Sequence, residues 1–140
     1  MVSSAAHPDP ASPWQRPGVR RLAGGQGWFY LVTGLWPVLH LPSFYAVTGP
    51  KVDGWLVQTV GALIAVTGFV LIRAARRHRV TSDLALLAAG QAAALAAIDV
   101  IFVARGRISA IYLGDAVVEG GLILAWWVLS RRPSPAPPPR

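Results

Sequence analysis

The sequence contains no cysteine and few charged residues. Cysteine is absent from all 140 residues, and charged residues make up only 14% of them, against roughly 25% in an average soluble domain. The absence of cysteine excludes a disulfide scaffold, a thiolate metal site and a cysteine nucleophile. So few charges cannot cover the surface of a soluble domain of this length. Acidic residues are the scarcest charged class, with six against thirteen Lys and Arg.

Hydrophobic residues make up 54% of the chain. They are concentrated in four apolar segments, at about residues 23–40, 54–72, 84–103 and 108–129, and about 20 residues suffice to cross a bilayer as a helix. The last three segments lack proline and are apolar around their whole circumference, unlike the helices of a soluble bundle. The sequence therefore predicts an all-α integral membrane bundle of four transmembrane helices over residues 20–131. Residues 1–19 and 132–140, rich in proline, are predicted to be tails.

The basic residues are distributed unevenly between the two sides of the predicted bundle. Ten of the thirteen lie near the chain termini or between the second and third segments, whereas Lys51, Arg105 and Arg107 lie on the other side. The positive-inside rule then places both termini in the cytoplasm. Because the basic residues mark topology in this way, the pI of 11.3 does not indicate a nucleic-acid partner.

The longest connection on the predicted outer side runs from residue 40 to residue 53. Pro42, Gly49 and Pro50 interrupt any continuous helix there, while the residues between them stay partly apolar. We expect a short interfacial helix or a re-entrant turn at the outer mouth of the bundle.

Aromatic residues gather near the predicted inner ends of two segments. Trp28, Phe29 and Tyr30 fall near the inner end of the first, and Trp126 and Trp127 near that of the fourth. These positions are typical of the aromatic belt at a membrane surface, although some of the side chains could belong to the core.

Glycines in the second segment predict close helix packing. Gly54, Gly61 and Gly68 recur every seven residues and therefore line one helical face. Helices in lipid associate through such small residues, and the third and fourth segments carry further glycines, among them Gly90 and Gly120. A homodimer is a further possibility, for which the sequence indicates no particular face.

Three of the six acidic residues lie inside the predicted spans: Asp99, Asp115 and Glu119. An ionised carboxylate near the bilayer centre costs at least about 2.5–3.5 kcal/mol, so such groups face the protein interior or a wet cavity. Asp115 and Glu119 are four residues apart and share a helical face. In an antiparallel hairpin, Asp99 would lie at a depth similar to that of Asp115.

The outer side offers further polar residues around these carboxylates, namely His40, Lys51, Asp53, Arg105 and Arg107. Together they could form a charged, water-accessible pocket suited to proton exchange or general acid/base chemistry. Alternatively, Arg105 and Arg107 could simply pair with Asp99 and Asp115 to close the hairpin, with Glu119 hydrogen-bonded to a neighbouring helix. No motif for a metal or another cofactor is present, and none is expected.

Residues 34–61 carry the specific pattern GLWPxLH followed by SFxxVTGPKxDxWLVxTVG, which begins at Gly34 and ends at Gly61. This pattern resembles one found in small bacterial four-span membrane proteins of unknown function. In size and number of spans the chain is also similar to DoxX-like membrane proteins, although without a specific DoxX motif. The resemblance implies a bacterial inner-membrane protein and assigns no activity.

Three classes of function remain open on these residues. The leading one is a membrane protein whose outward-facing pocket, lined by carboxylates, binds or translocates a small solute or a proton. The second is a membrane-embedded enzyme that uses the same carboxylates as acid and base on a lipid-soluble substrate. The third is a structural or accessory subunit with no site of its own.

Overall fold

The computed structural model describes residues 12–131, so most of the predicted N-terminal tail and the whole C-terminal tail lie outside the described residues. Within this range the chain is entirely helical, with no strand, which confirms the all-α prediction. The elements are η1 (Pro13–Gln15), α1 (Pro17–Leu39), α2 (Leu41–Thr48), α3 (Gly54–Arg76), α4 (Ser82–Ala104) and α5 (Tyr112–Arg131).

The first long helix begins six residues earlier than the apolar segment indicates. Pro17 starts α1, where its fixed φ suits the first helical position and its missing N–H costs no hydrogen bond. Val19 is buried in the core, so residues 12–19, expected in the tail, are structured. At the other end, Pro37 lies two residues before the last residue of α1, and α2 follows in the connection where a short helix or a re-entrant turn was expected.

Helices α3, α4 and α5 are long and apolar enough to cross a membrane. Large apolar side chains cover their outer faces, including Leu86 (74% exposed) on α4 and Val117 (76% exposed) on α5. Soluble monomers rarely expose apolar patches of this extent. The distribution of apolar side chains is therefore typical of a protein surrounded by lipid.

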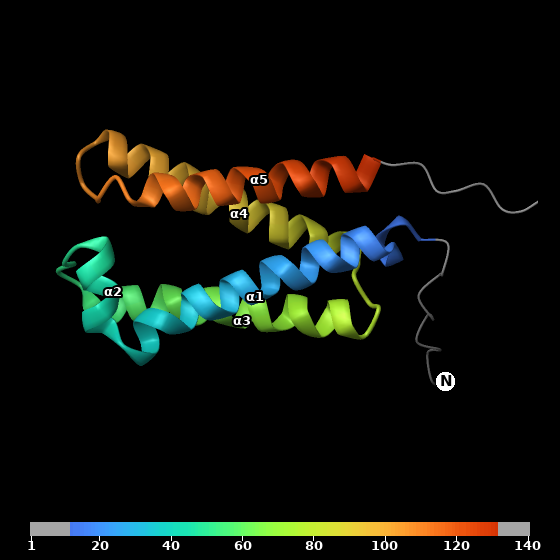
Figure 1. Ribbon diagram of the computed structural model, residues 1–140, viewed down its shortest axis with the longest axis horizontal. Helices are drawn as coiled ribbons and strands as arrows, with labels where there is room; N and C mark the ends of the chain where they lie inside the picture. The colour runs from blue at the N-terminus through green and yellow to red at the C-terminus, as the bar shows by residue number, and fades with distance from the viewer. Residues whose placement is uncertain (1–11, 132–140) are drawn as a thin grey trace, which may run out of the picture.

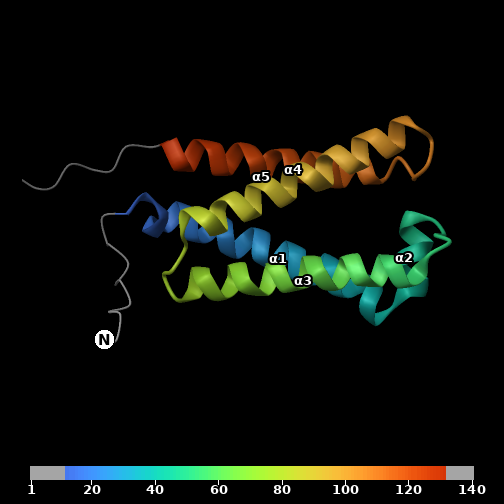
Figure 2. The ribbon, with the colours of Figure 1, turned by 180° about the vertical axis from the view of Figure 1, so that it is seen from behind.

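The long helices form two antiparallel pairs, α1 with α3 and α4 with α5 (Figure 1). The beginning of α1, the end of α5 and the α3–α4 connection lie at one end of the molecule, which we call the terminal end. Helix α2 and the α4–α5 connection lie at the opposite end, the α2 end. The two pairs meet at the terminal end and diverge toward the α2 end, as the view from behind also shows (Figure 2).

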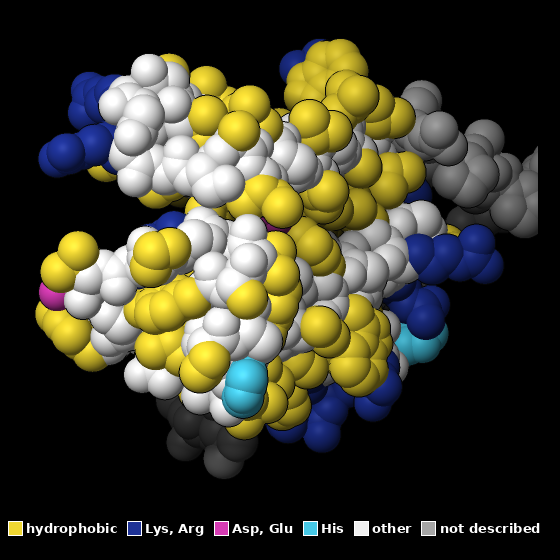
Figure 3. Space-filling model, turned by 60° about the vertical axis from the view of Figure 1, so that its left-hand side comes forward, with side chains coloured by type: hydrophobic (Ala, Val, Ile, Leu, Met, Phe, Trp, Pro, Cys, Tyr) yellow, Lys and Arg dark blue, Asp and Glu magenta, His cyan; other side chains and the backbone are white. Residues whose placement is uncertain are grey.

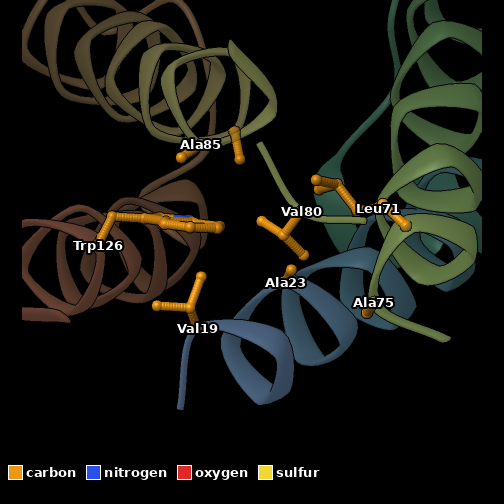
Figure 4. Close-up of a cluster of buried hydrophobic side chains, with 9 residues drawn as sticks. Val19, Ala23, Leu71, Ala75, Val80, Ala85 and Trp126 are labelled. Atoms are coloured by element: carbon orange, nitrogen blue, oxygen red, sulfur yellow. The ribbon is translucent and has the colours of Figure 1, made fainter. Parts of the chain in front are cut away.

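A compact core joins the two pairs at the terminal end. Figure 4 shows the ring of Trp126 on α5 between Val19 of α1 and Ala85 of α4, with its edge toward Val80 of the α3–α4 connection. The buried members of this core are Val19, Ala23, Leu71, Ala74, Ala75, Val80, Ala85, Ala88 and Trp126. Small alanines on three helices allow the large indole to fill the space between them.

Two of the predicted belt aromatics are core residues instead. Tyr30 and Trp126 are 1% and 3% exposed, whereas Trp28 and Trp127 are half exposed on the outer surface. The indole N–H of Trp126 donates a 2.7 Å hydrogen bond to Gln26 Oε1. Because a buried indole requires such an acceptor, Gln26 explains why Trp126 turns inward.

Glycines of α3 lie against glycines of α1. A Cβ added to Gly61 would meet the carbonyl oxygen of Gly34 at 2.5 Å, and one added to Gly68 would meet that of Gly27 at the same distance. The two glycines of α1 are seven residues apart, and so are the two glycines of α3. In antiparallel helices this equal spacing lets both contacts form at once. Gly54 lies against α2 instead, near Tyr45.

The glycines of α4 and α5, including Gly90 and Gly120, have no atom within 4 Å of an added Cβ among the described residues. Among the described glycines, close approach to the backbone of another helix is therefore confined to α1 and α3. The homodimer stays a prediction.

Candidate functional site: a cavity lined by carboxylates

A cavity of about 550 Å³ lies where the two helix pairs diverge. Figure 3 turns the α2 end toward the viewer and shows a hollow between the pairs, with an acidic side chain visible in its depth. Residues of all five α-helices line it, including the aromatic Phe29, Tyr30, Trp36, Phe44 and Tyr112. The acidic lining residues are Asp99, Asp115 and Glu119, and no Lys, Arg or His is among the described residues of its wall.

The structure brings together the three carboxylates of the predicted spans. Asp99 projects from α4, and Asp115 and Glu119 project from the same face of α5, across the antiparallel hairpin. Asp99 is 6% exposed and Glu119 is completely buried. Asp99 Oδ2 and Glu119 Oε1 have no hydrogen-bond partner among the described residues, although buried polar atoms nearly always have one.

Glu119 is oriented by a residue that the sequence reasoning did not select. The hydroxyl of Tyr30 on α1 donates a 2.8 Å hydrogen bond to Glu119 Oε2. Tyr30 follows Gln26 by four residues, so both polar side chains share one face of α1. This spacing was the available signal, and it indicates which face of α1 turns toward α4 and α5.

Asp99 and Asp115 lie within interaction distance of each other. Two ionised carboxylates repel at such a separation, and neither has a hydrogen to donate to the other. A proton or a cation between them would relieve this repulsion.

The two arginines of the hairpin do not neutralise these aspartates. Arg105 and Arg107 are exposed, and the Arg105 guanidinium lies 5.8 Å from the centroid of the Phe102 ring. Neither forms an ion pair with Asp99 or Asp115 in the described part of the chain. The ion pairs by which these arginines would close the hairpin are therefore not observed, whereas the hydrogen bond between Glu119 and a neighbouring helix, which the same alternative expects, is present.

Lys51, in the connection after α2, makes contacts near the mouth of the cavity. Its Nζ donates to the carbonyl oxygens of Thr48 and Gly49, at 3.0 and 3.3 Å, and lies 5.1 Å from the centroid of the Tyr112 ring on α5. Burial lowers the pKa of Lys51 below its ordinary value of 10.5. Lys51 does not itself line the cavity, and its contacts join the end of α2 to the first turn of α5.

The remaining predicted residues lie outside the cavity wall. His40 is exposed and accepts a 3.2 Å hydrogen bond at Nδ1 from the backbone N–H of Ser43, which caps α2. Asp53 is exposed beside the start of α3. Among the described residues, no three His, Cys, Asp or Glu side chains are placed to hold a metal ion.

Trp36 holds α2 over one side of the cavity. Its indole N–H donates a 2.8 Å hydrogen bond to Ser43 Oγ, and its ring meets Phe44 edge-on, with 5.6 Å between the centroids. These contacts could not be predicted from the sequence, because they depend on how α2 folds back over α1. They give the cavity an aromatic wall.

Comparisons with protein-family models, with curated proteins and with solved structures found no match to this chain. The function proposed below is therefore inferred from the geometry of the cavity.

Proposed function

We propose that the protein is a four-span bacterial inner-membrane protein whose cavity binds a small solute or proton and passes it toward the other side. The observation that carries this proposal is the convergence of Asp99, Asp115 and Glu119 on one cavity, with two buried carboxylate oxygens left unpartnered. Intramembrane carboxylates are expensive to bury and mark ion or substrate pathways.

We assign α1 as the fourth span. Its 23 residues extend about 35 Å at 1.5 Å per residue, enough for a hydrocarbon core of about 30 Å. It packs along α3 through Gly27 and Gly34, and its polar side chains Gln26 and Tyr30 are buried. These features suit a helix that crosses the membrane beside α3.

The charges at the two ends support an outward-facing cavity. Arginines flank the terminal end, on α1, in the α3–α4 connection and at the end of α5, whereas Lys51, Arg105 and Arg107 are the only basic residues at the α2 end in the described part of the chain. The positive-inside rule favours a cytoplasmic terminal end. The mouth of the cavity then faces outward, and the core around Trp126 closes the inner side.

Transfer across the membrane would require this core to open. Glu119 lies between the cavity and the core, seven residues before Trp126 on α5, and its Oε1 is free to take a proton while Oε2 stays bonded to Tyr30. Proton exchange at Glu119 would thus change the charge at the junction of the two helix pairs. Such a change in charge can shift the balance between a closed and an open packing of the two helix pairs.

The proposal is tested with the full chain reconstituted in vesicles loaded with a pH-sensitive dye. A panel of small cationic, neutral and anionic solutes is added outside, and the internal pH is followed. We expect at least one solute to drive proton flux, and Asp115→Asn with Glu119→Gln to abolish it. Asp53→Asn, which neutralises an exposed carboxylate outside the cavity, should leave the flux unchanged. Flux that persists in the folded double variant would overturn the proposal.

A membrane-embedded enzyme is the second candidate. The mostly apolar wall and the position of the cavity between two helix pairs suit a lipid-soluble substrate, with Asp99 and Asp115 as acid and base. Chemical conversion of lipid extracts by the purified protein, without any solute-dependent flux, would favour this candidate. The accessory-subunit alternative fits less well, since it calls for paired carboxylates and no cavity.

A further inference from the structure

We propose that the ligand of the cavity is a hydrophobic organic cation, whose positive centre lies by the carboxylates and whose apolar groups contact the aromatic wall. This inference rests on the proposed function, in which the cavity is a ligand site, and it specifies the chemical class of the ligand.

The charge of the wall selects a cation. Asp99, Asp115 and Glu119 line the cavity, and no basic side chain lies among its described lining residues. Asp99 and Glu119 are more than nine-tenths buried, and each has an oxygen without a partner. Leaving a buried carboxylate uncompensated is strongly unfavourable. A bound cation would supply the missing partner, whereas an anion would be repelled.

The walls select an organic cation over a metal ion. Hard metal cations require about six or more oxygen ligands for Ca²⁺, or a strict octahedral set for Mg²⁺, and no described cluster offers a metal site. The wall instead presents aromatic rings, among them Phe29, Trp36 and Phe44. Aromatic faces attract desolvated organic cations, and 550 Å³ lies within the range of about 300–1,000 Å³ for small-molecule pockets.

The rim of the cavity is apolar as well. Leu56, Ile98 and Ile111 line it and are each about half exposed. These side chains would contact a ligand that enters from the boundary between lipid and water. Amphiphilic cations concentrate at that boundary, because their charge stays hydrated while their apolar groups enter the lipid.

The experiment compares two probes of the same shape and opposite charge, tetraphenylphosphonium and tetraphenylborate, in equilibrium dialysis with the full chain in neutral detergent. We expect saturable binding of tetraphenylphosphonium, at least about tenfold tighter than that of tetraphenylborate, which corresponds to about 1.4 kcal/mol. Asp99→Asn and Asp115→Asn should each weaken phosphonium binding by about tenfold or more. Asp53→Asn serves as the matched control and should bind as the wild type does.

A second variant tests the cavity without altering its charge. Leu95 lines the cavity from α4, and Leu95→Trp should fill the space and weaken phosphonium binding while every carboxylate is kept. If an aspartate variant fails to fold, the Leu95→Trp variant still tests whether phosphonium binds in the cavity.

Several results would overturn the cation assignment. They are equal or tighter binding of tetraphenylborate, undiminished phosphonium binding in both aspartate variants, or undiminished binding in the folded Leu95→Trp variant. Proton flux driven only by neutral or anionic solutes would also overturn it, while leaving the proposed function in place. The proposed function itself would be overturned by proton flux that does not depend on Asp115 and Glu119, however tightly the two probes bind.

Discussion

Tyr30 on α1 and Glu119 on α5 are joined by a buried hydrogen bond of 2.8 Å, although 89 residues separate them in the chain. The bond links the two helix pairs at the inner part of the cavity, next to the core that closes the terminal end. It fixes one oxygen of Glu119 and leaves the other without a partner. The geometry thus couples a carboxylate of the cavity to the packing of the whole bundle.

Replacing Tyr30 by phenylalanine should affect both stability and flux. Tyr30→Phe removes the donor to Glu119 Oε2, so we expect a stability loss on the order of 1 kcal/mol and a marked loss of solute-dependent proton flux. Thermal unfolding in detergent and vesicle flux measure the two effects. Tyr45→Phe is the matched control, because the Tyr45 hydroxyl is buried without a partner and its removal should cost little. Equal effects of the two changes would contradict the assigned role of Tyr30.

The indole N–H of Trp126 should stabilise the junction between the two helix pairs. Trp126→Phe leaves Gln26 Oε1 buried without its donor, while Gln26 Nε2 remains bonded to the carbonyl oxygen of Ala88. We expect a stability loss of about 1–3 kcal/mol in thermal or denaturant unfolding. Trp127→Phe, on the exposed face of the same helix turn, should change stability by much less. A larger effect at Trp127 would show that the indole hydrogen bond is not what stabilises the junction.

A methyl group at Gly61 should separate α1 from α3. In Gly61→Ala the new Cβ would meet the Gly34 carbonyl oxygen at 2.5 Å, and since backbone cannot yield as a side chain can, we expect a loss of about 1–3 kcal/mol. Gly25→Ala on α1 meets no atom within 4 Å and should be neutral or slightly stabilising, because alanine favours helix. Thermal unfolding of the two variants checks the difference. Unchanged stability in Gly61→Ala would contradict the close approach of these helices.

The absence of native cysteine permits a direct test of topology. Ser109→Cys lies at the α2 end and Ser82→Cys at the terminal end, and both serines are exposed. The proposed orientation predicts that a membrane-impermeant maleimide, added to cells with a permeabilised outer membrane, labels Ser109→Cys readily and Ser82→Cys only after lysis. The reverse pattern would contradict the orientation, and labelling of both from outside would contradict the assignment of α4 as a complete span.

Lys51 should give stability a recognisable pH dependence. Because burial lowers its pKa in the folded state below 10.5, the unfolded chain binds more protons between the two values, and stability rises with pH across that window. We therefore expect wild type to gain stability relative to Lys51→Met as the pH rises from neutral toward 10.5, measured by thermal unfolding. A constant difference would show that the Lys51 ammonium is not desolvated in the folded protein.

The sequence by itself determined the properties that depend on local order. Apolar runs of sufficient length specify the helices, and the spacing of Asp115 and Glu119 places both on one face of α5. The short α4–α5 connection was enough to bring Asp99 near Asp115. The start of α1 was less predictable, because Val19 is ordered by packing against other helices rather than by a local apolar run.

Only the tertiary structure decided which faces of the helices meet. A helix that is apolar on all sides has no polar stripe to mark its buried face, because lipid and protein interior are equally apolar surroundings. The inward placement of Tyr30 and Trp126, the exposure of Arg105 and Arg107, and the cavity itself therefore follow from packing. That packing joins α1 to α3 and α4 to α5, and the gap between the two pairs is where the carboxylates are brought together.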